Sequence, residues 1–207
     1  MTLPPDDAVL LAAVERYART TVAPHVERWE REGRIGRDAW GEAAALGLMG
    51  IEVPAAHGGL GRPFSCKVRV AEVLAQVDFG FTMSLVNTGN LAAKLLQHAA
   101  PHVAQRYLAD LLSGARVGCT ALTEPHAGSD FAAITTHAER VPGGWRLNGR
   151  KAWITNASDT DLVVLYAQTE PGSGARGVAG FVVDGRRPGF VREAPYALTG
   201  QNTIGVG

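Results

Sequence analysis

The chain contains 207 residues, enough for one large domain or for two smaller domains that each bury a hydrophobic core. Its 20 Lys and Arg residues balance its 20 Asp and Glu residues, so no excess charge favours binding to nucleic acid or to an anionic membrane. Hydrophobic residues make up 46% of the sequence, an ordinary fraction for a globular protein, which rules out disorder as the default expectation.

The first residues, MTLPPDD, lack the basic and apolar regions of a signal peptide, and no apolar run approaches transmembrane length. The two cysteines, Cys66 and Cys119, lie far apart without a CxxC partner, which favours reduced thiols over a disulfide or a zinc site. These features predict a cytoplasmic protein that does not enter a membrane.

The first half of the chain has the periodicity of helices. Apolar residues recur at three-to-four spacing over residues 10–21, and we expect Pro24 to kink this helix and Gly33 to end it. A second helix is expected through RDAWGEAAALG, up to Gly47, before the Pro- and Gly-rich crossing GLMGIEVPAAHGGLGRP. Further helices are predicted in CKVRVAEVLAQ, FTMSLVNTGNLAAKLLQHA and PHVAQRYLADLLSG.

From Val117 onward the apolar period changes to two. A hairpin is expected from His137 to Leu147 around a Pro-Gly-Gly turn, followed by a tight Asn-Gly turn and a strand over residues 151–155. The segments DLVVLYAQ, GVAGFVVD and GFVREAPYAL are further candidate strands. Helices followed by a block of antiparallel strands predict an α+β fold with two domains, residues 1–115 and 116–207.

Two motifs that suggest other chemistry lack the context that this chemistry needs. GSGARG, residues 172–177, matches a dinucleotide-binding pattern but leads into an alternating strand rather than a helix, so we interpret it as a hairpin loop. His98 and His102 have the spacing of metal ligands on a helix, but Pro101 interrupts their shared face. No GxSxG motif supports a catalytic triad, and no metal site is predicted.

The run TALTEPHAGSDF, from Thr120 to Phe131, combines features of a ligand-binding loop. Pro125 stiffens the backbone, and Gly128 permits a ligand to approach it closely. The hydroxyls of Thr123 and Ser129 can donate and accept hydrogen bonds, as the edge of a heteroaromatic ring or a phosphate requires.

A second segment, KAWITNAS, places Trp153 two residues before Thr155. Residues two apart on a strand share a face, so an indole and a hydroxyl together could bind a flat cofactor with a polar edge. The alternative is that Trp153 belongs to the core of the sheet domain and that Thr155 caps the end of a strand. The residues alone leave both interpretations open.

TALTEPHAGSD and GRKAWITNA together resemble the signature segments of the acyl-CoA dehydrogenase family, and GLMGIEVPAAHGGLG and RYLADLLSGARVG resemble its N-terminal domain. The resemblance covers nearly the whole chain. It implies an N-terminal helical domain and a mainly antiparallel β-barrel domain that contacts FAD, followed in the family by a C-terminal helical domain. It also implies that the cofactor-binding residues are Leu122, Thr123, Gly128, Ser129, Trp153, Ile154 and Thr155.

The resemblance also implies individual roles. Thr123 would bond the pyrimidine end of the flavin, Trp153 would pack beside the isoalloxazine, and Thr155 would lie near its hydride-accepting nitrogen. Ser129 would lie near both the flavin phosphates and the acyl thioester substrate. Glu124 is expected to make loop hydrogen bonds, as is Asp130, and the alternative of Glu124 as a catalytic base is disfavoured.

The family oxidises CH–CH groups: it removes the α-proton of an acyl thioester and passes the β-hydride to FAD. Its catalytic carboxylate lies in the C-terminal helical domain, and the given sequence stops at Gly207, so we expect no catalytic base in this chain. The tail YALTGQNTIGVG departs from the family pattern, which only Gly200 and Thr203 fit loosely.

Three accounts follow from this. The first is one part of a split or shortened dehydrogenase, acting on acyl-CoA or an acyl-carrier protein. It needs a protein partner that carries the helical domain, in a hetero- or homo-oligomer. The second is another flavin enzyme on the same fold, such as a monooxygenase. The third is a non-catalytic binding subunit.

Overall fold

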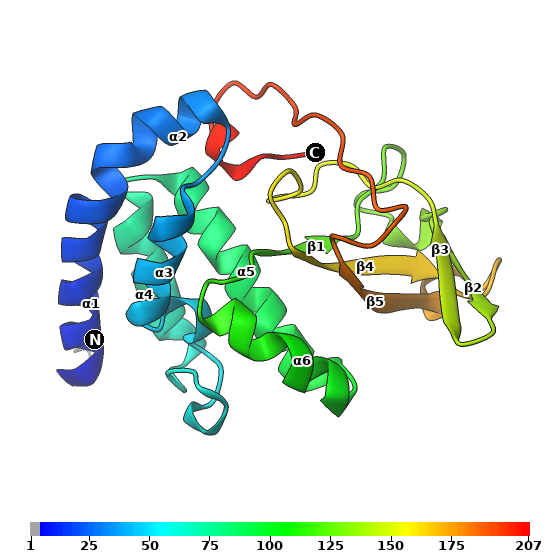
Figure 1. The fold of residues 1–207 in the computed structure, drawn as a ribbon, viewed down its shortest axis with the longest axis horizontal. Helices are drawn as coiled ribbons and strands as arrows, with labels where there is room; N and C mark the ends of the chain where they lie inside the picture. Colours follow the sequence, from blue (N-terminus) through cyan, green and yellow to red (C-terminus); the bar gives the residue numbers. More distant parts are fainter. Residues whose placement is uncertain (1–4) are drawn as a thin grey trace.

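The helical half of the molecule lies beside a small sheet, and one long helix contacts both (Figure 1). A computed structural model describes residues 5–207; residues 1–4, which begin the segment compared with signal peptides, lie outside the described residues. The helices are α1 (Pro5–Tyr17), α2 (Val26–Glu32), α3 (Arg37–Ala45), α4 (Phe64–Ala75), α5 (Phe79–His98) and α6 (Pro101–Leu112).

The connection between α1 and α2 changes helix type, as Pro24 predicts. A π-helical segment, Ala18–Val22, and a 3-10 turn, Ala23–His25, join the two helices, because proline cannot donate the backbone hydrogen bond of a regular α-helix. Gly33 ends α2 in the left-handed conformation, at φ 66°, where glycine has no Cβ to clash. These sequence-based expectations are confirmed.

The core of the helical half forms around Phe81 of α5. Trp29 stacks on its ring with centroids 5.7 Å apart, and Trp40 of α3 lies at the same distance. All three side chains are buried. Their large apolar surfaces make them the strongest contributors to packing in this half of the molecule.

The second half forms one mixed sheet of five strands: β1 (Gly118–Ala121), β2 (His137–Val141), β3 (Gly144–Asn148), β4 (Leu162–Gln168) and β5 (Val178–Asp184). β4 pairs in parallel with β1 and, at one position, with β2, and antiparallel with β5. The β2–β3 pair is an antiparallel hairpin. The α+β class is confirmed, and GSGARG lies in the β4–β5 connection as predicted.

The expected β-barrel is not formed: the described strands make an open, mixed sheet, although most of their pairing is antiparallel, as predicted. The predicted strand over GFVREAPYAL is not formed: this segment contains Pro195, follows Pro188, and is almost entirely exposed. The segment over residues 189–198 covers one face of the sheet incompletely. A cavity of about 920 Å³ remains between this segment and the sheet, lined in part by Leu165, Phe181 and Val191.

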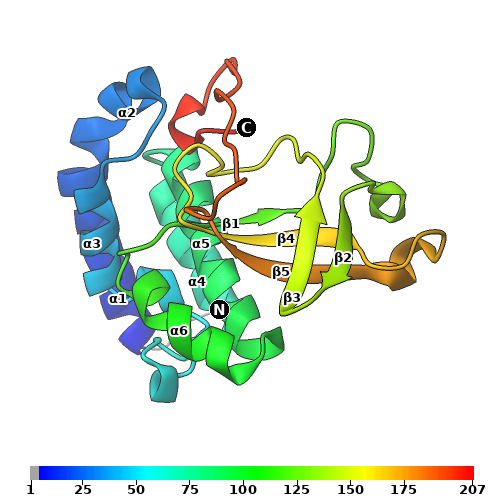
Figure 2. The same ribbon diagram turned by 45° about the vertical axis from the view of Figure 1, so that its right-hand side comes forward.

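The last residues return from the sheet to the helical half (Figure 2). Glu30 of α2 accepts hydrogen bonds from the backbone N–H and the hydroxyl of Thr203, at 3.1 and 3.0 Å, and from the amide of Asn202. Ile154 and Gly207 exchange backbone hydrogen bonds of 2.7 and 3.2 Å. The tail thus joins α2 to the segment that contains Trp153.

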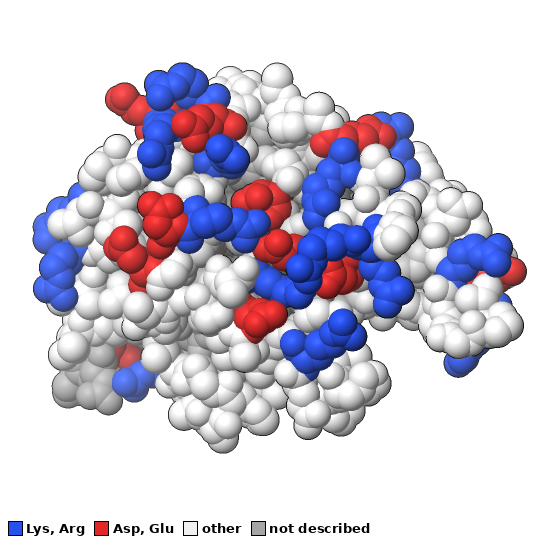
Figure 3. Space-filling view, in the orientation of Figure 1, with Lys and Arg blue, Asp and Glu red and all other residues white. Residues whose placement is uncertain are grey.

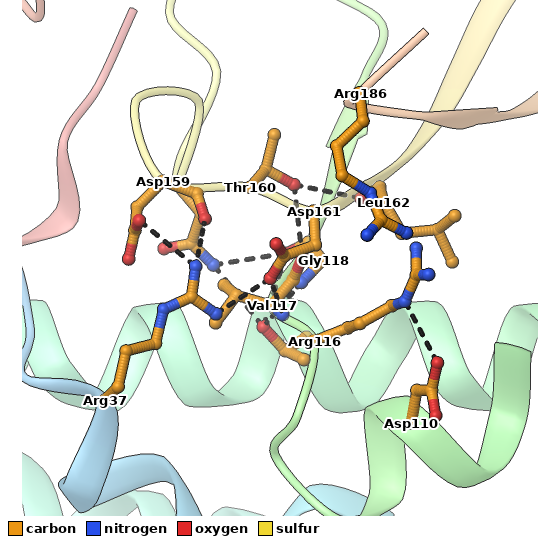
Figure 4. Close-up of polar contacts among 12 residues, drawn as sticks. Arg37, Asp110, Arg116, Val117, Gly118, Asp159, Thr160, Asp161, Leu162 and Arg186 are labelled. Atoms are coloured by element: carbon orange, nitrogen blue, oxygen red, sulfur yellow. Dashed lines mark hydrogen bonds and ion pairs between the residues drawn. The ribbon is translucent and has the colours of Figure 1, made fainter.

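A polar network fixes the junction between the two halves (Figure 4). Arg37 of α3 donates to Asp161 at 2.8 Å and to Asp159 at 3.2 Å. The same oxygen of Asp161 accepts the backbone N–H of Val117 at 2.9 Å. Figure 3 shows acidic and basic side chains intermixed over this face, without a large region of one sign.

Candidate functional site

The loop TEPHA, residues 123–127, follows the end of β1 and is organised around one buried carboxylate, that of Glu124. Glu124 and Ala127 exchange backbone hydrogen bonds of 2.9 and 3.1 Å, with Pro125 in the tight turn between them. The side chain of Glu124 accepts from the backbone N–H groups of Thr135 and Thr136 and from the Thr135 hydroxyl. Glu124 therefore ties both ends of the loop together, the structural role expected for it.

Lys151 joins this loop to the second signature segment. Its ammonium donates to Oε1 of Glu124 at 2.8 Å and to the carbonyl oxygen of Leu122 at 2.9 Å. Burial alone would raise the pKa of Glu124, but the hydrogen bonds from Lys151, Thr136 and Thr135 outweigh it and lower the pKa to about 2. Lys151 was not identified as a site residue from the sequence. The available signal was its position in the segment GRKAWITNA, two residues before Trp153.

The segment after Lys151 is a turn-rich loop and not the predicted strand. Trp153 has a φ of 62°, in the left-handed region, which a strand does not allow. Trp153 and Thr155 therefore do not share one face of a strand, and the prediction made from their spacing is wrong. The alternative that Trp153 belongs to the core is also wrong, because this side chain is 58% exposed.

Asn156 anchors this loop and was not identified from the sequence. Its buried amide accepts from the Ser84 hydroxyl at 2.5 Å and donates to the carbonyl oxygens of Ser84 and Gly118, each at 3.2 Å. Its φ of 67° is one that asparagine adopts more readily than most residues. The available signal in the sequence was the asparagine that follows Trp-Ile-Thr, because asparagine favours left-handed turns.

The predicted cofactor residues fall into two groups. Backbone contacts bring Leu122 and Thr123 beside the second loop, with the N–H of Ala152 donating to the Thr123 carbonyl at 3.0 Å. Trp153 and Thr155 follow directly along the chain. Gly128 and Ser129 lie exposed beyond the Glu124 turn.

Ile154 points away from the surface. Its side chain packs with Cys119, Ala121 and Val163 against the sheet, and its backbone is paired with Gly207. Ile154 therefore holds the loop in place, while the residues on either side of it remain accessible.

Three hydroxyls in these loops are free to bind a ligand. Those of Thr123, Ser129 and Thr155 make no hydrogen bond within residues 5–207. A Cβ added to Gly128 would meet no atom within 4 Å, so the folded chain itself does not require glycine there. The hydroxyls of Thr123 and Thr155, on the two joined loops that also carry the exposed Trp153, suit a flat ligand with hydrogen-bonding edges.

The class of protein is therefore an α+β protein with a candidate ligand site in its sheet half. Helices form the first half, a mixed sheet forms the second, and the hydroxyl-bearing loops lie near the junction of the two halves. Two family models match the chain: "Acyl-CoA dehydrogenase, N-terminal domain" at residues 4–115 and "Acyl-CoA dehydrogenase, middle domain" at residues 119–207. The chain belongs to the acyl-CoA dehydrogenase family.

Individual relatives agree with this assignment. The mitochondrial isovaleryl-CoA dehydrogenase of Arabidopsis thaliana is 32% identical over 181 residues, which cover 86% of this chain and 44% of that protein. The structure of an acyl-CoA dehydrogenase from Geobacillus kaustophilus matches with a TM-score of 0.92 and 27% identity, covering 99% of this chain and 54% of that one. A Mycobacterium smegmatis glutaryl-CoA dehydrogenase in complex with FADH2 matches with a TM-score of 0.89 and 27% identity, covering 97% and 51%.

The chain thus spans about half the length of the relatives it matches. Within residues 5–207, no helix combines the length and the apolar character needed to cross a membrane. A cytoplasmic location stays a prediction.

Proposed function

We propose that this chain supplies the FAD-contacting part of an acyl thioester α,β-dehydrogenase whose catalytic base lies outside residues 1–207. Membership of the family supports the reaction class, and the relative solved with FADH2 supports the cofactor. The single observation that carries the proposal is that Thr123 and Thr155, whose hydroxyls make no hydrogen bond within residues 5–207, lie with the exposed Trp153 on the two loops that Lys151 joins.

The available groups fit a flavin. Trp153 offers an accessible aromatic surface, and Thr123 and Thr155 offer donors and acceptors on the two loops that Lys151 joins. When bound, FAD would accept the hydride. Hydrogen bonds from the two threonines would orient its ring and stabilise the charge that arrives on it.

The surface of α5 offers a place for the acyl chain. Phe79 and Met83 are 50% and 36% exposed and precede Asn87 at four-residue spacing, so the three residues follow one face of the helix. The amide of Asn87 donates to the backbone oxygen of Thr155 at 3.3 Å. An apolar chain on this face would end near the proposed flavin residues, with Ser129 contributing to thioester binding.

Glu124 cannot serve as the base that removes the α-proton. A carboxylate whose pKa is lowered to about 2 holds a proton weakly, and hydrogen bonds and an ion pair already occupy both of its oxygens. We therefore place the base on a separate helical chain or on a further segment of a longer protein.

The test is co-purification from the native source, followed by a visible absorption spectrum and mass spectrometry of bound chains. The proposal predicts bound FAD, and bleaching of its visible bands by an acyl thioester only when a chain or segment with the helical domain is present. An assembly that lacks flavin would support the non-catalytic binding subunit. Oxygen-dependent product formed from supplied reduced flavin would support the monooxygenase instead.

A further inference from the structure

Trp153 and Tyr196 form an aromatic stack at the surface of the molecule. Their ring centroids lie 4.3 Å apart with 30° between the ring planes. Trp153 is 58% exposed and Tyr196 is 36% exposed, so burial in a core does not account for the pairing. Tyr196 covers part of the indole and leaves the rest accessible.

The backbone of Trp153 is fixed. Its φ of 62° is held by neighbours on the C-terminal side, since Ile154 pairs with Gly207 and Asn156 is bonded to α5. Fixing the backbone fixes the direction of the Cα–Cβ bond but leaves the two side-chain torsions of the tryptophan free. A contact with the ring itself is needed to hold the indole in one orientation.

Tyr196 can provide that contact because its own backbone is anchored to the same segment. Its N–H donates to the carbonyl oxygen of Val206 at 2.8 Å, next to the residue that pairs with Ile154. The two aromatic residues are therefore linked through Val206 and Gly207, which fixes their separation. If the side-chain torsions of Trp153 are already ordered, ligand binding does not carry the entropy cost of ordering them.

We propose that Tyr196 is a positioning residue: it stacks on the Trp153 indole and holds its accessible surface ready to pack against the isoalloxazine of FAD. This inference rests on the proposed function, because it assumes that FAD binds beside Trp153. The ring of Tyr196 carries the effect, and its hydroxyl, which makes no hydrogen bond within residues 5–207, does not.

The test compares Tyr196→Leu with the conservative Tyr196→Phe, each introduced at the native gene so that the whole assembly is recovered. Phe181→Leu is the matched control, since the ring of Phe181, on β5, makes its edge-on contact with Trp145 at 5.4 Å and not with Trp153. After removal of bound flavin, FAD is titrated back, and its dissociation constant and emission are measured.

Tyr196→Leu should weaken FAD binding about three- to tenfold, the range expected for one lost aromatic contact. It should also raise the emission of bound flavin, because a mobile indole quenches it less. Tyr196→Phe and Phe181→Leu should match the wild type in both properties. Circular dichroism of each variant checks that the fold is retained, as expected for a side chain at the surface.

The two proposals fail in different ways. If the wild-type assembly binds no FAD, the proposed function is wrong and this inference falls with it. If the wild type binds FAD and the folded Tyr196→Leu variant binds it equally, with unchanged emission, only the positioning role is overturned. A loss of affinity in Tyr196→Phe as large as that in Tyr196→Leu would also overturn it, because the aromatic ring would then not be the cause.

Discussion

The ammonium of Lys151 lies 2.8 Å from Oε1 of Glu124, and both side chains are almost completely buried. This ion pair joins the loop after β1 to the loop that carries Trp153. Because a buried charge without a partner is costly, neither residue can be neutralised alone without a large loss of stability.

Replacing Glu124 with Gln should therefore lower the free energy of unfolding by about 3 kcal/mol, because it leaves the Lys151 ammonium without its counter-charge. Urea unfolding followed by circular dichroism measures the change. Glu139→Gln is the matched control: Glu139 pairs with Arg146 at 3.7 Å on the surface, so its loss should cost less than about 1 kcal/mol. Equal effects of the two substitutions would contradict the role assigned to Glu124.

The pKa of Glu124 also predicts how stability depends on pH. Its folded-state pKa, lowered to about 2, lies below the ordinary value of 4.5, so the unfolded chain takes up the proton first as pH falls. The stabilisation is complete above pH 4.5 and decreases between pH 4.5 and pH 2, by about 3 kcal/mol in total. Unfolding free energies across this range should fall more steeply in the wild type than in Glu124→Gln. Parallel curves would show that Glu124 is not the group responsible.

Asn156→Ala should destabilise the protein by about 2–4 kcal/mol, because it removes several buried hydrogen bonds. It also places alanine at a positive φ, which alanine adopts less readily than asparagine. Asn156→Gly relieves the backbone strain but not the lost bonds, so it should be somewhat less harmful. Asn148→Ala, at an exposed strand end, is the control and should change little. Thermal unfolding of the three variants tests the ranking, and an Asn156→Ala variant as stable as the wild type would refute it.

Thr155→Val should weaken FAD binding about fivefold, the equivalent of one hydrogen bond worth about 1 kcal/mol, and should leave folding intact. Thr20→Val serves as the control, because Thr20 lies in the helical segment after α1, far from these loops along the chain. Flavin titration of both variants provides the measurement. Unchanged affinity in Thr155→Val would place the cofactor elsewhere on the surface.

Arg37→Ala should loosen the junction between the helical half and the sheet. Arg37 is about half exposed, so solvent screening limits the expected loss to about 1 kcal/mol, and that loss should shrink at high salt. Arg34→Ala removes a more exposed pair with Glu32 at 3.9 Å and should have a smaller effect. Urea unfolding at low and high salt tests this, and a loss independent of salt would argue against an electrostatic junction.

Much of the architecture could be predicted from local patterns. Gly33 and Pro24 marked the end and the kink of helices because their backbone constraints act without help from the rest of the fold. The apolar run in DLVVLYAQ and the alternation in GVAGFVVD likewise predicted β4 and β5. The open, mixed sheet in place of a barrel could not be predicted this way, since strand pairing depends on partners that are distant in sequence.

The candidate site shows where local patterns are insufficient. Lys-Ala-Trp-Ile-Thr has the composition of a strand, but Asn156 finds three partners on α5 and β1, and these tertiary bonds turn the backbone into the left-handed region at Trp153. The residue types in the site were identifiable because their chemistry is local. Their arrangement was not, because it depends on an asparagine bonded to a helix far away in sequence.

The central claim is that the two loops joined by Lys151 and Glu124 bind the isoalloxazine of FAD. The most direct measurement is an experimental structure of the native assembly with its flavin bound. The account predicts the ring beside Trp153, within hydrogen-bonding distance of Thr123 and Thr155. Protein atoms filling that position, or flavin bound against another surface of the chain, would contradict it.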